Sequence, residues 1–322
     1  MSRGSLPGIL AVLTAAFLWG TTGTAATFAP DVGPLPIGAA ALGVGGLLQA
    51  AIAVPSLRRE TSALISRRGT VMAGAAGVAI YPLAFYSSMH LAGVAAGTVV
   101  SLGSAPIVSG ILERVVERRR LSGWWMLAAT LGIAGSAVLS GAKMHDAPGE
   151  ALPTIAGVGL GLVAGGTYAV YSWSAHRLIN RGIGRAAAMG AVFGLGGAAL
   201  MPVLLISGAP LLADTQSFTV SAYMALIPMF LGYVLFVYGL THLTASTATT
   251  LTLAEPAVAA VLAVVIVGER LPLLAWAGIA GICTSLLVLS FAPATRADKI
   301  QNHPLPRCSD TVELAAQSSR ER

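Results

Sequence analysis

Long apolar runs recur along the whole chain and limit its fold more than any other feature. A helix needs about 20 mostly apolar residues to cross the hydrocarbon core of a membrane, and the chain contains ten such runs. None alternates in the way a membrane β-strand does. The sequence therefore predicts an all-α membrane protein with ten transmembrane helices. Their approximate limits are 7–29, 35–54, 70–90, 93–113, 122–141, 154–175, 187–207, 219–241, 244–267 and 272–291.

Charged residues are too few to cover a water-facing surface. They make up 10% of the 322 residues, whereas a soluble domain carries about 25%. This composition excludes an ordinary soluble enzyme and a disordered protein. The first run follows Arg3 and lacks a convincing cleavage site, so we interpret it as a retained signal-anchor helix.

The positions of the basic residues predict the topology. With the N-terminus in the cytoplasm, 17 of the 19 basic residues lie in inner segments, and only Lys143 and Arg270 lie outside. This is the positive-inside pattern, and it predicts a bacterial inner-membrane protein with both termini cytoplasmic. The basic excess then marks topology and contacts membrane lipids, and no nucleic-acid partner is expected. The inner basic residues are Arg3, Arg58, Arg59, Arg67, Arg68, Arg114, Arg118, Arg119, Arg120, Arg177, Arg181, Arg185, Arg296, Lys299, Arg307, Arg320 and Arg322.

The chain repeats itself at a period of about 150 residues. A Tyr-x4-Tyr-x3-His pattern begins at Tyr81 and again at Tyr233, and Pro106 matches Pro256. Residues 1–148 and 149–291 are thus predicted to be two five-helix repeats, followed by a disordered cytoplasmic tail over 292–322. Because five is odd, tandem copies must insert in opposite orientations, which is the inverted-repeat architecture of many secondary transporters.

Small residues and prolines within the spans suggest how the helices pack. Pairs of glycines such as Gly43–Gly46, Gly74–Gly77 and Gly194–Gly197 would allow close backbone approach. Either tight static packing or sliding helices would use such surfaces. Pro106 and Pro256 each remove a backbone donor and predict kinks that bend two equivalent helices around a shared space.

Glu255 is the one acidic residue near the centre of a predicted span. An ionisable group at this depth costs about 2.5–3.5 kcal/mol on insertion scales and is by default a functional-site hypothesis. Burial should favour its neutral form. It could carry a proton, bind a substrate ammonium, or alternate between the two; the alternative is a protonated carboxyl that bonds a neighbouring helix. Glu113 and Glu117, at an inner helix end, are expected to reach headgroup water.

Other polar side chains in the spans complete the predicted substrate or coupling-ion site. Thr252 lies three residues before Glu255 and thus on the same face of a continuous helix. Tyr81 and Tyr233 fall near mid-span, whereas Trp19 and Tyr168 lie nearer span ends. For the latter pair an interfacial aromatic belt is the competing interpretation.

Motifs of several other classes are missing from the sequence. There is no Gly-x4-Gly-Lys-Ser/Thr phosphate loop, and the chain has only two lysines, so ATP drive from this chain is not expected. Cys283 and Cys308 are far apart and form no metal signature. We expect no catalytic residues, no metal and no cofactor.

The residues singled out above resemble the drug/metabolite transporter superfamily, of the EamA-like type. The resemblance rests on Trp19-Gly20, Tyr168-Ala169, and the run from Ala254-Glu255-Pro256 to Gly268-Glu269-Arg270-Leu271, and it covers roughly 7–291. In the first half Arg118-Arg119-Arg120-Leu121 stands where the family often has Gly-Glu-Arg-Leu. The resemblance implies a ten-helix inverted-repeat carrier, some members of which are coupled to protons.

The resulting hypothesis is a secondary transporter that exports a small metabolite, such as an amino acid or a drug-like compound, by alternating access. An importer or exchanger of the same fold is one alternative. A membrane enzyme or lipid-handling protein, or an accessory subunit without flux, are others. Substrate, direction, coupling ion and oligomeric state are left open.

Overall fold

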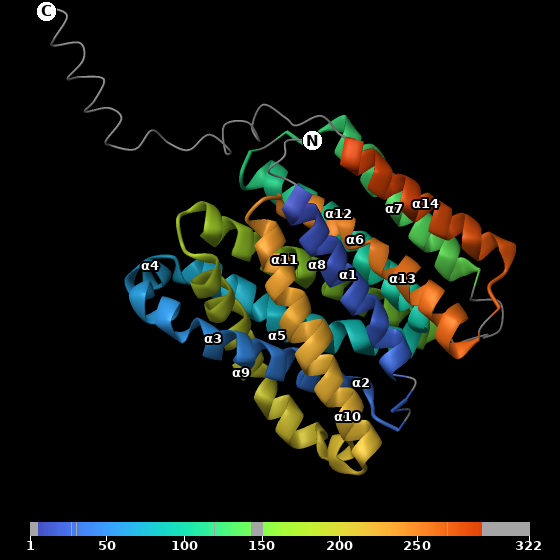
Figure 1. The fold of residues 1–322 in the computed structure, drawn as a ribbon, viewed down its shortest axis with the longest axis horizontal. Helices are drawn as coiled ribbons and strands as arrows, with labels where there is room; N and C mark the ends of the chain where they lie inside the picture. The colour runs from blue at the N-terminus through green and yellow to red at the C-terminus, as the bar shows by residue number, and fades with distance from the viewer. Residues whose placement is uncertain are drawn as a thin grey trace, which may run out of the picture.

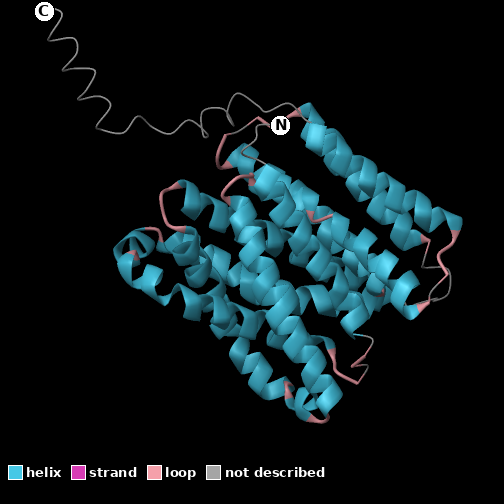
Figure 2. Cartoon of the chain, in the orientation of Figure 1, coloured by secondary structure: helices cyan, strands magenta, loops and turns pink. Residues whose placement is uncertain are grey.

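The chain is all-helical in the part that the structure describes. The structure is a computed structural model, and the described residues are 6–26, 28–29, 31–118, 120–142, 151–268 and 270–291. These residues form helices and connecting loops with no β-strand (Figure 2). This confirms the predicted all-α class. Arg3, Lys143, Glu269 and the tail 292–322 lie outside the described residues, and so do the predictions that concern them.

Every predicted apolar run is helical, and seven of the ten form one helix each. The seven are α1 (Leu6–Ala26), α5 (Arg68–Ala92), α6 (Val94–Val115), α7 (Gly123–Gly141), α8 (Ala151–Asn180), α9 (Arg185–Ser207) and α14 (Leu273–Phe291). Eight helical segments are long and apolar enough to cross a membrane, and two further apolar segments, Gly123–Leu139 and Leu273–Leu289, are shorter. The chain is therefore a multi-pass membrane protein.

The other three predicted spans are interrupted helices. Each contains a π-helical segment, in which the hydrogen bonds are one residue wider than in an α-helix and which is often found at functional sites. The second comprises α2 (Pro34–Gly38), η1 (Ala39–Val44) and α3 (Gly45–Arg59). The eighth comprises α10 (Thr215–Met224), η3 (Ala225–Leu231) and α11 (Gly232–Leu240). The ninth comprises α12 (Ala245–Leu251), α13 (Ala254–Leu262) and η4 (Ala263–Val267). Short helices α4 (Thr61–Ser66) and η2 (Ala209–Leu212) connect spans.

The helices form one bundle with a pair of helices at its edge (Figure 1). α8 packs along α5 and α6, α1 packs along α11 and α13, and α3 packs against α9. α7 and α14 lie side by side and form most of their contacts with each other. A large core of buried residues runs through the bundle, and a separate small one lies between α13 and the α7–α14 pair.

Glycines allow the closest of these helix contacts, as the sequence predicted. A Cβ atom on Gly77 of α5 would lie 2.8 Å from the Thr167 carbonyl oxygen of α8. On α7, a Cβ atom on Gly135 would lie 2.8 Å from the Gly278 carbonyl oxygen of α14. Such distances are far below van der Waals contact, so any larger residue would push these backbones apart. Gly43 and Gly46 of the second span meet α9 in the same way.

Candidate functional site

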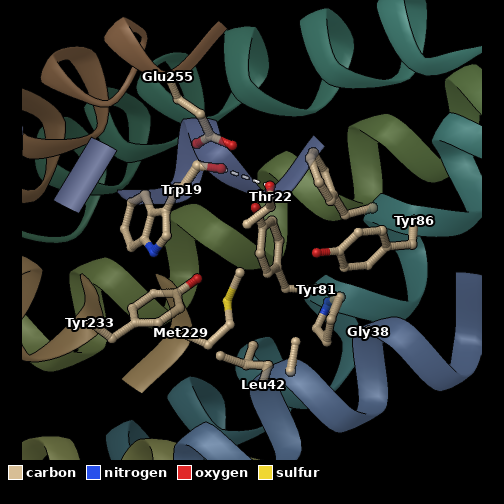
Figure 3. A pocket seen from close by; sticks show the side chains of 12 residues that line it. Trp19, Thr22, Gly38, Leu42, Tyr81, Tyr86, Met229, Tyr233 and Glu255 are labelled. Atoms are coloured by element: carbon tan, nitrogen blue, oxygen red, sulfur yellow. Dashed lines mark hydrogen bonds between the residues drawn. The ribbon is translucent and has the colours of Figure 1, made fainter. Parts of the chain in front are cut away.

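A central cavity lies where five of the spans meet (Figure 3). Side chains from α1, from the second span, from α5, from the η3–α11 segment and from α13 surround it. Two of the π-helical segments, η1 and η3, contribute to its wall. The lining residues are Trp19, Thr22, Gly38, Ala41, Leu42, Tyr81, Pro82, Phe85, Tyr86, Met229, Tyr233 and Glu255.

Glu255 reaches the cavity because the ninth span is broken just before it. α12 ends at Leu251 and α13 begins at Ala254, with a turn between them. Pro256 has no N–H to continue a helical ladder, and in the turn the Glu255 amide donates to the Thr252 carbonyl at 2.9 Å. The break therefore lies at Thr252 and Leu253, a few residues before the proline, and it sets the direction of the Glu255 side chain.

The Glu255 carboxylate has no partner among the described residues. It is half-buried and faces the cavity (Figure 3), and no hydrogen bond or ion pair joins it to another described group. The hydroxyls of Tyr81 and Tyr86 likewise have no hydrogen-bond partner in the described part of the chain. The Thr22 hydroxyl, by contrast, donates to the Trp19 carbonyl at 2.7 Å. Three polar side chains are thus free to bind a ligand.

Aromatic rings make up much of the remaining wall. The centroid of the Trp19 ring lies 4.7 Å from that of Tyr233, and the Tyr81 and Phe85 rings stack at 5.5 Å. Trp19 is fixed in place because its indole Nε1 donates to the Pro228 carbonyl at 2.9 Å. That carbonyl belongs to η3. The π-helical segment thus offers a backbone acceptor that orients one wall of the cavity.

Two predicted site residues form a layer behind the cavity. The Tyr168 hydroxyl donates to the Thr252 hydroxyl at 3.0 Å, and the Thr252 hydroxyl donates to the Thr249 carbonyl at 2.9 Å. The Tyr171 and Tyr233 hydroxyls lie 2.8 Å apart. The prediction that Thr252 shares a helix face with Glu255 is wrong, because the helix breaks between them.

The predicted aromatic site residues gather at one place. Trp19, Tyr81 and Tyr233 line the cavity, and Tyr168 contacts Trp19 edge-on at a centroid distance of 6.3 Å. Trp19 and Tyr168 are 4% and 1% exposed. An interfacial belt is therefore the wrong interpretation for these two residues, since they lie inside the bundle.

The two equivalent prolines have different local outcomes. α6 continues through Pro106 as one helix, whereas the ninth span breaks near Pro256. Ala105, the position that matches Glu255 in the first repeat, is fully buried, and a Cβ atom on Gly165 of α8 would lie 3.2 Å from its amide. The first half therefore has no room for an acidic side chain there. A kink at Pro106 stays a prediction.

Glu113 is placed differently from the sequence prediction. It is 3% exposed rather than in contact with headgroup water. Its carboxylate accepts from the Ser246 amide at 2.8 Å and from the Ser246 hydroxyl at 2.7 Å. Because Ser246 lies in the first turn of α12, a carboxylate there satisfies donors that have no partner within the helix. Glu113 thus joins α6 to α12.

Replacing Glu113 by glutamine should destabilise the protein. The variant keeps the shape of the side chain but loses the negative charge, and hydrogen bonds to charged groups contribute about 1.5–3 kcal/mol against about 1 for neutral ones. We expect a loss of about 1–2 kcal/mol, measured as a lower unfolding temperature of the purified protein. Asp31→Asn, at an exposed loop carboxylate, should leave that temperature unchanged. Equal unfolding temperatures for both variants would contradict the role given to Glu113.

Several residues of the site were not predicted. Tyr86, Phe85 and Met229 line the cavity, and Gln49 of α3 is fully buried beside it, with its amide donating to the Met229 carbonyl at 3.4 Å. Gln49 could have been found as the single amide within an apolar run. Phe85 and Met229 have no such signal, because apolar residues are common in every span.

The cavity is closed to large molecules in this conformation. The space open to the centre of a water molecule is about 20 Å³, and one water needs roughly 10–15 Å³ by this measure. A ligand larger than a few waters therefore requires side chains or helices to move. Met229, an unbranched and flexible side chain, is the least constrained part of the wall.

An all-helical membrane bundle with a polar cavity among its spans is typical of transporters. A sequence model of the EamA-like transporter family matches residues 6–141 and again residues 155–291. The chain belongs to this family, and with it to the drug/metabolite transporter superfamily.

Comparisons with individual proteins agree with this assignment. The chain is 35% identical over 285 residues to a protein of Bacillus subtilis (strain 168) named "Uncharacterized transporter YwfM", covering 88% of this chain and 94% of that protein. A solved crystal structure superposes with a TM-score of 0.71 at 20% identity, covering 89% of this chain and 96% of the other. At that identity the structural likeness concerns the fold alone.

Proposed function

We propose that this membrane transporter is a secondary exporter of the bacterial inner membrane that moves a small metabolite, such as an amino acid or a drug-like compound, by alternating access. The observation that carries the proposal is the unpartnered Glu255 carboxylate in a cavity enclosed by helices of both halves. Ionisable groups placed this way are rare unless they bind substrate or a coupling ion. Both termini would be cytoplasmic, as the basic residues predict.

The arrangement of helices supports an inverted repeat over residues 1–148 and 149–291. α8, the first span of the second half, packs on the third and fourth spans of the first half, α5 and α6. α1 packs on the corresponding spans of the second half. The second span packs on the seventh, and the fifth on the tenth. A two-fold axis in the membrane plane would generate this exchange, and the family model also matches twice.

Alternating access requires a closed side, and Glu113 supplies one. With the predicted orientation, Glu113 and Ser246 lie at the cytoplasmic ends of α6 and α12, and the cavity lies toward the outer ends. The two hydrogen bonds to Ser246 then hold the inner side closed. Inward opening would separate α6 from α12 and break these bonds.

Flux measurements on the purified protein in liposomes test the proposal. Candidate substrates are first chosen by their ability to raise the unfolding temperature, since a ligand that binds only the folded state stabilises it. Preloaded liposomes should then release a selected compound faster than empty-protein liposomes do. An importer would instead show uptake only. Chemical turnover of a bound lipid, without flux, would favour the enzyme or lipid-handling alternative.

A further inference from the structure

We propose that the transported compound is an organic cation, an amine or a quaternary ammonium, whose positive charge sits between the Glu255 carboxylate and the aromatic walls of the central cavity. The inference rests on the proposed transport function and names the chemical class of its substrate. It excludes compounds whose recognition depends on a negative group.

The charge of the cavity lining favours a cation. Glu255 is the one charged residue among the lining residues, which include no arginine, lysine or histidine. Its carboxylate has no hydrogen bond or ion pair within the described part of the chain. An ionised carboxylate away from water requires a partner of opposite charge. No described side chain supplies that partner, so a cationic ligand would supply it.

The aromatic wall favours the same class of ligand. Trp19, Tyr81, Tyr86 and Tyr233 surround the space below the Glu255 carboxylate (Figure 3). A cation over the face of such rings is attracted by their quadrupole, and cages of this kind recognise quaternary ammonium groups. The fixed position of Trp19 against the Pro228 carbonyl and the Tyr233 ring means that little of this wall must be ordered on binding.

A free carboxylate on the ligand would find no matching group. It would face Glu255, a like charge, and the electron-rich faces of the rings. The hydroxyls of Tyr81 and Tyr86 are the available donors, and each can give one hydrogen bond. An amine should therefore bind more tightly than the amino acid with the same side chain, and the corresponding acid should bind least.

Three compounds that share a phenyl ring and a two-carbon chain test this order. Phenethylamine carries only the ammonium, phenylalanine carries both charges, and 3-phenylpropionate carries only the carboxylate. Binding to the full-length protein in detergent is measured by calorimetry, with tetraethylammonium as a second cation. We expect phenethylamine to bind at least tenfold more tightly than phenylalanine, with no saturable binding of 3-phenylpropionate.

Two variants connect the binding to the carboxylate. Glu255→Gln should weaken binding of phenethylamine at least tenfold, whereas Glu255→Asp, which keeps the charge, should retain most of it. The aspartate variant also serves if the glutamine variant does not fold. Binding of the acid or the amino acid as tightly as the amine would overturn the inference, as would no binding of either cation.

The outcomes separate this inference from the proposed function. Cation binding that depends on Glu255 without flux of any bound compound would refute transport and leave the site assignment intact. Flux of anionic or neutral compounds only, with no binding of cations, would refute the inference and leave the transport function intact.

Discussion

Replacing Glu255 by glutamine is expected to abolish pH-dependent transport while leaving the protein folded and inserted. Glutamine has nearly the same shape but carries neither a titratable proton nor a negative charge. The groups that face Glu255 from α5 and α11 are the tyrosines Tyr81, Tyr86 and Tyr233. Since no charged residue lines the cavity besides Glu255, no other group there can replace its proton or its charge.

The size of the effect follows from the lost interaction. A hydrogen bond to a charged group contributes about 1.5–3 kcal/mol, which is roughly a tenfold to hundredfold change in affinity. Folding should not suffer, because the carboxylate has no partner to lose. We therefore expect flux that varies with the pH gradient in the wild type and does not respond to it in the variant.

Liposomes with a set pH gradient provide the measurement, and Asp31→Asn provides the matched control. That substitution makes the same chemical change at an exposed loop and should leave coupled flux intact. Normal pH-dependent flux from a well-folded Glu255→Gln protein would show that the coupling group lies elsewhere.

Gly77→Leu is expected to lower the stability of the bundle strongly. A Cβ atom at this position would lie 2.8 Å from the Thr167 carbonyl oxygen and 3.3 Å from the Tyr171 Cβ atom. The first of these atoms is backbone and cannot rotate away. α5 and α8 must then separate, and overpacking of this kind typically costs 1–3 kcal/mol and occasionally more.

Gly159→Leu on α8 is the matched control. Gly159 is exposed on the bundle surface, and a Cβ atom there would meet nothing within 4 Å. Because glycine is about 1 kcal/mol less favourable than alanine in a helix interior, filling this position should be neutral or slightly stabilising. The fraction of protein that stays monodisperse after heating measures both variants. If the two behave alike, the α5–α8 contact does not depend on a glycine at position 77.

Much of the fold is predictable from the sequence because the membrane imposes a local rule. Each span must be long and apolar, so the runs along the chain coincide with helices, and an acid inside a run is conspicuous. Glu255 was found for this reason. The glycines were predicted at the helix contacts because, in lipid, association depends on close backbone approach.

The features that were not predicted depend on partners far away in the chain. Glu113 looked like a surface residue because its partner, Ser246, is 133 positions away. The π-helical segments depend on neighbours such as Trp19, which donates to a carbonyl 209 positions away. The break at Thr252 invalidated a same-face interpretation that assumed a continuous helix. Hydropathy carries none of this pairing information.

The α7–α14 pair has a consequence for biosynthesis. α14 is the last described helix to leave the ribosome, and its main partner α7 ends well over a hundred residues earlier in the chain. Until α14 arrives, the face of α7 around Gly135 has no covering helix, so the bundle cannot be completed span by span in the order of synthesis. The edge pair closes late, whereas the spans around the cavity can already be assembled.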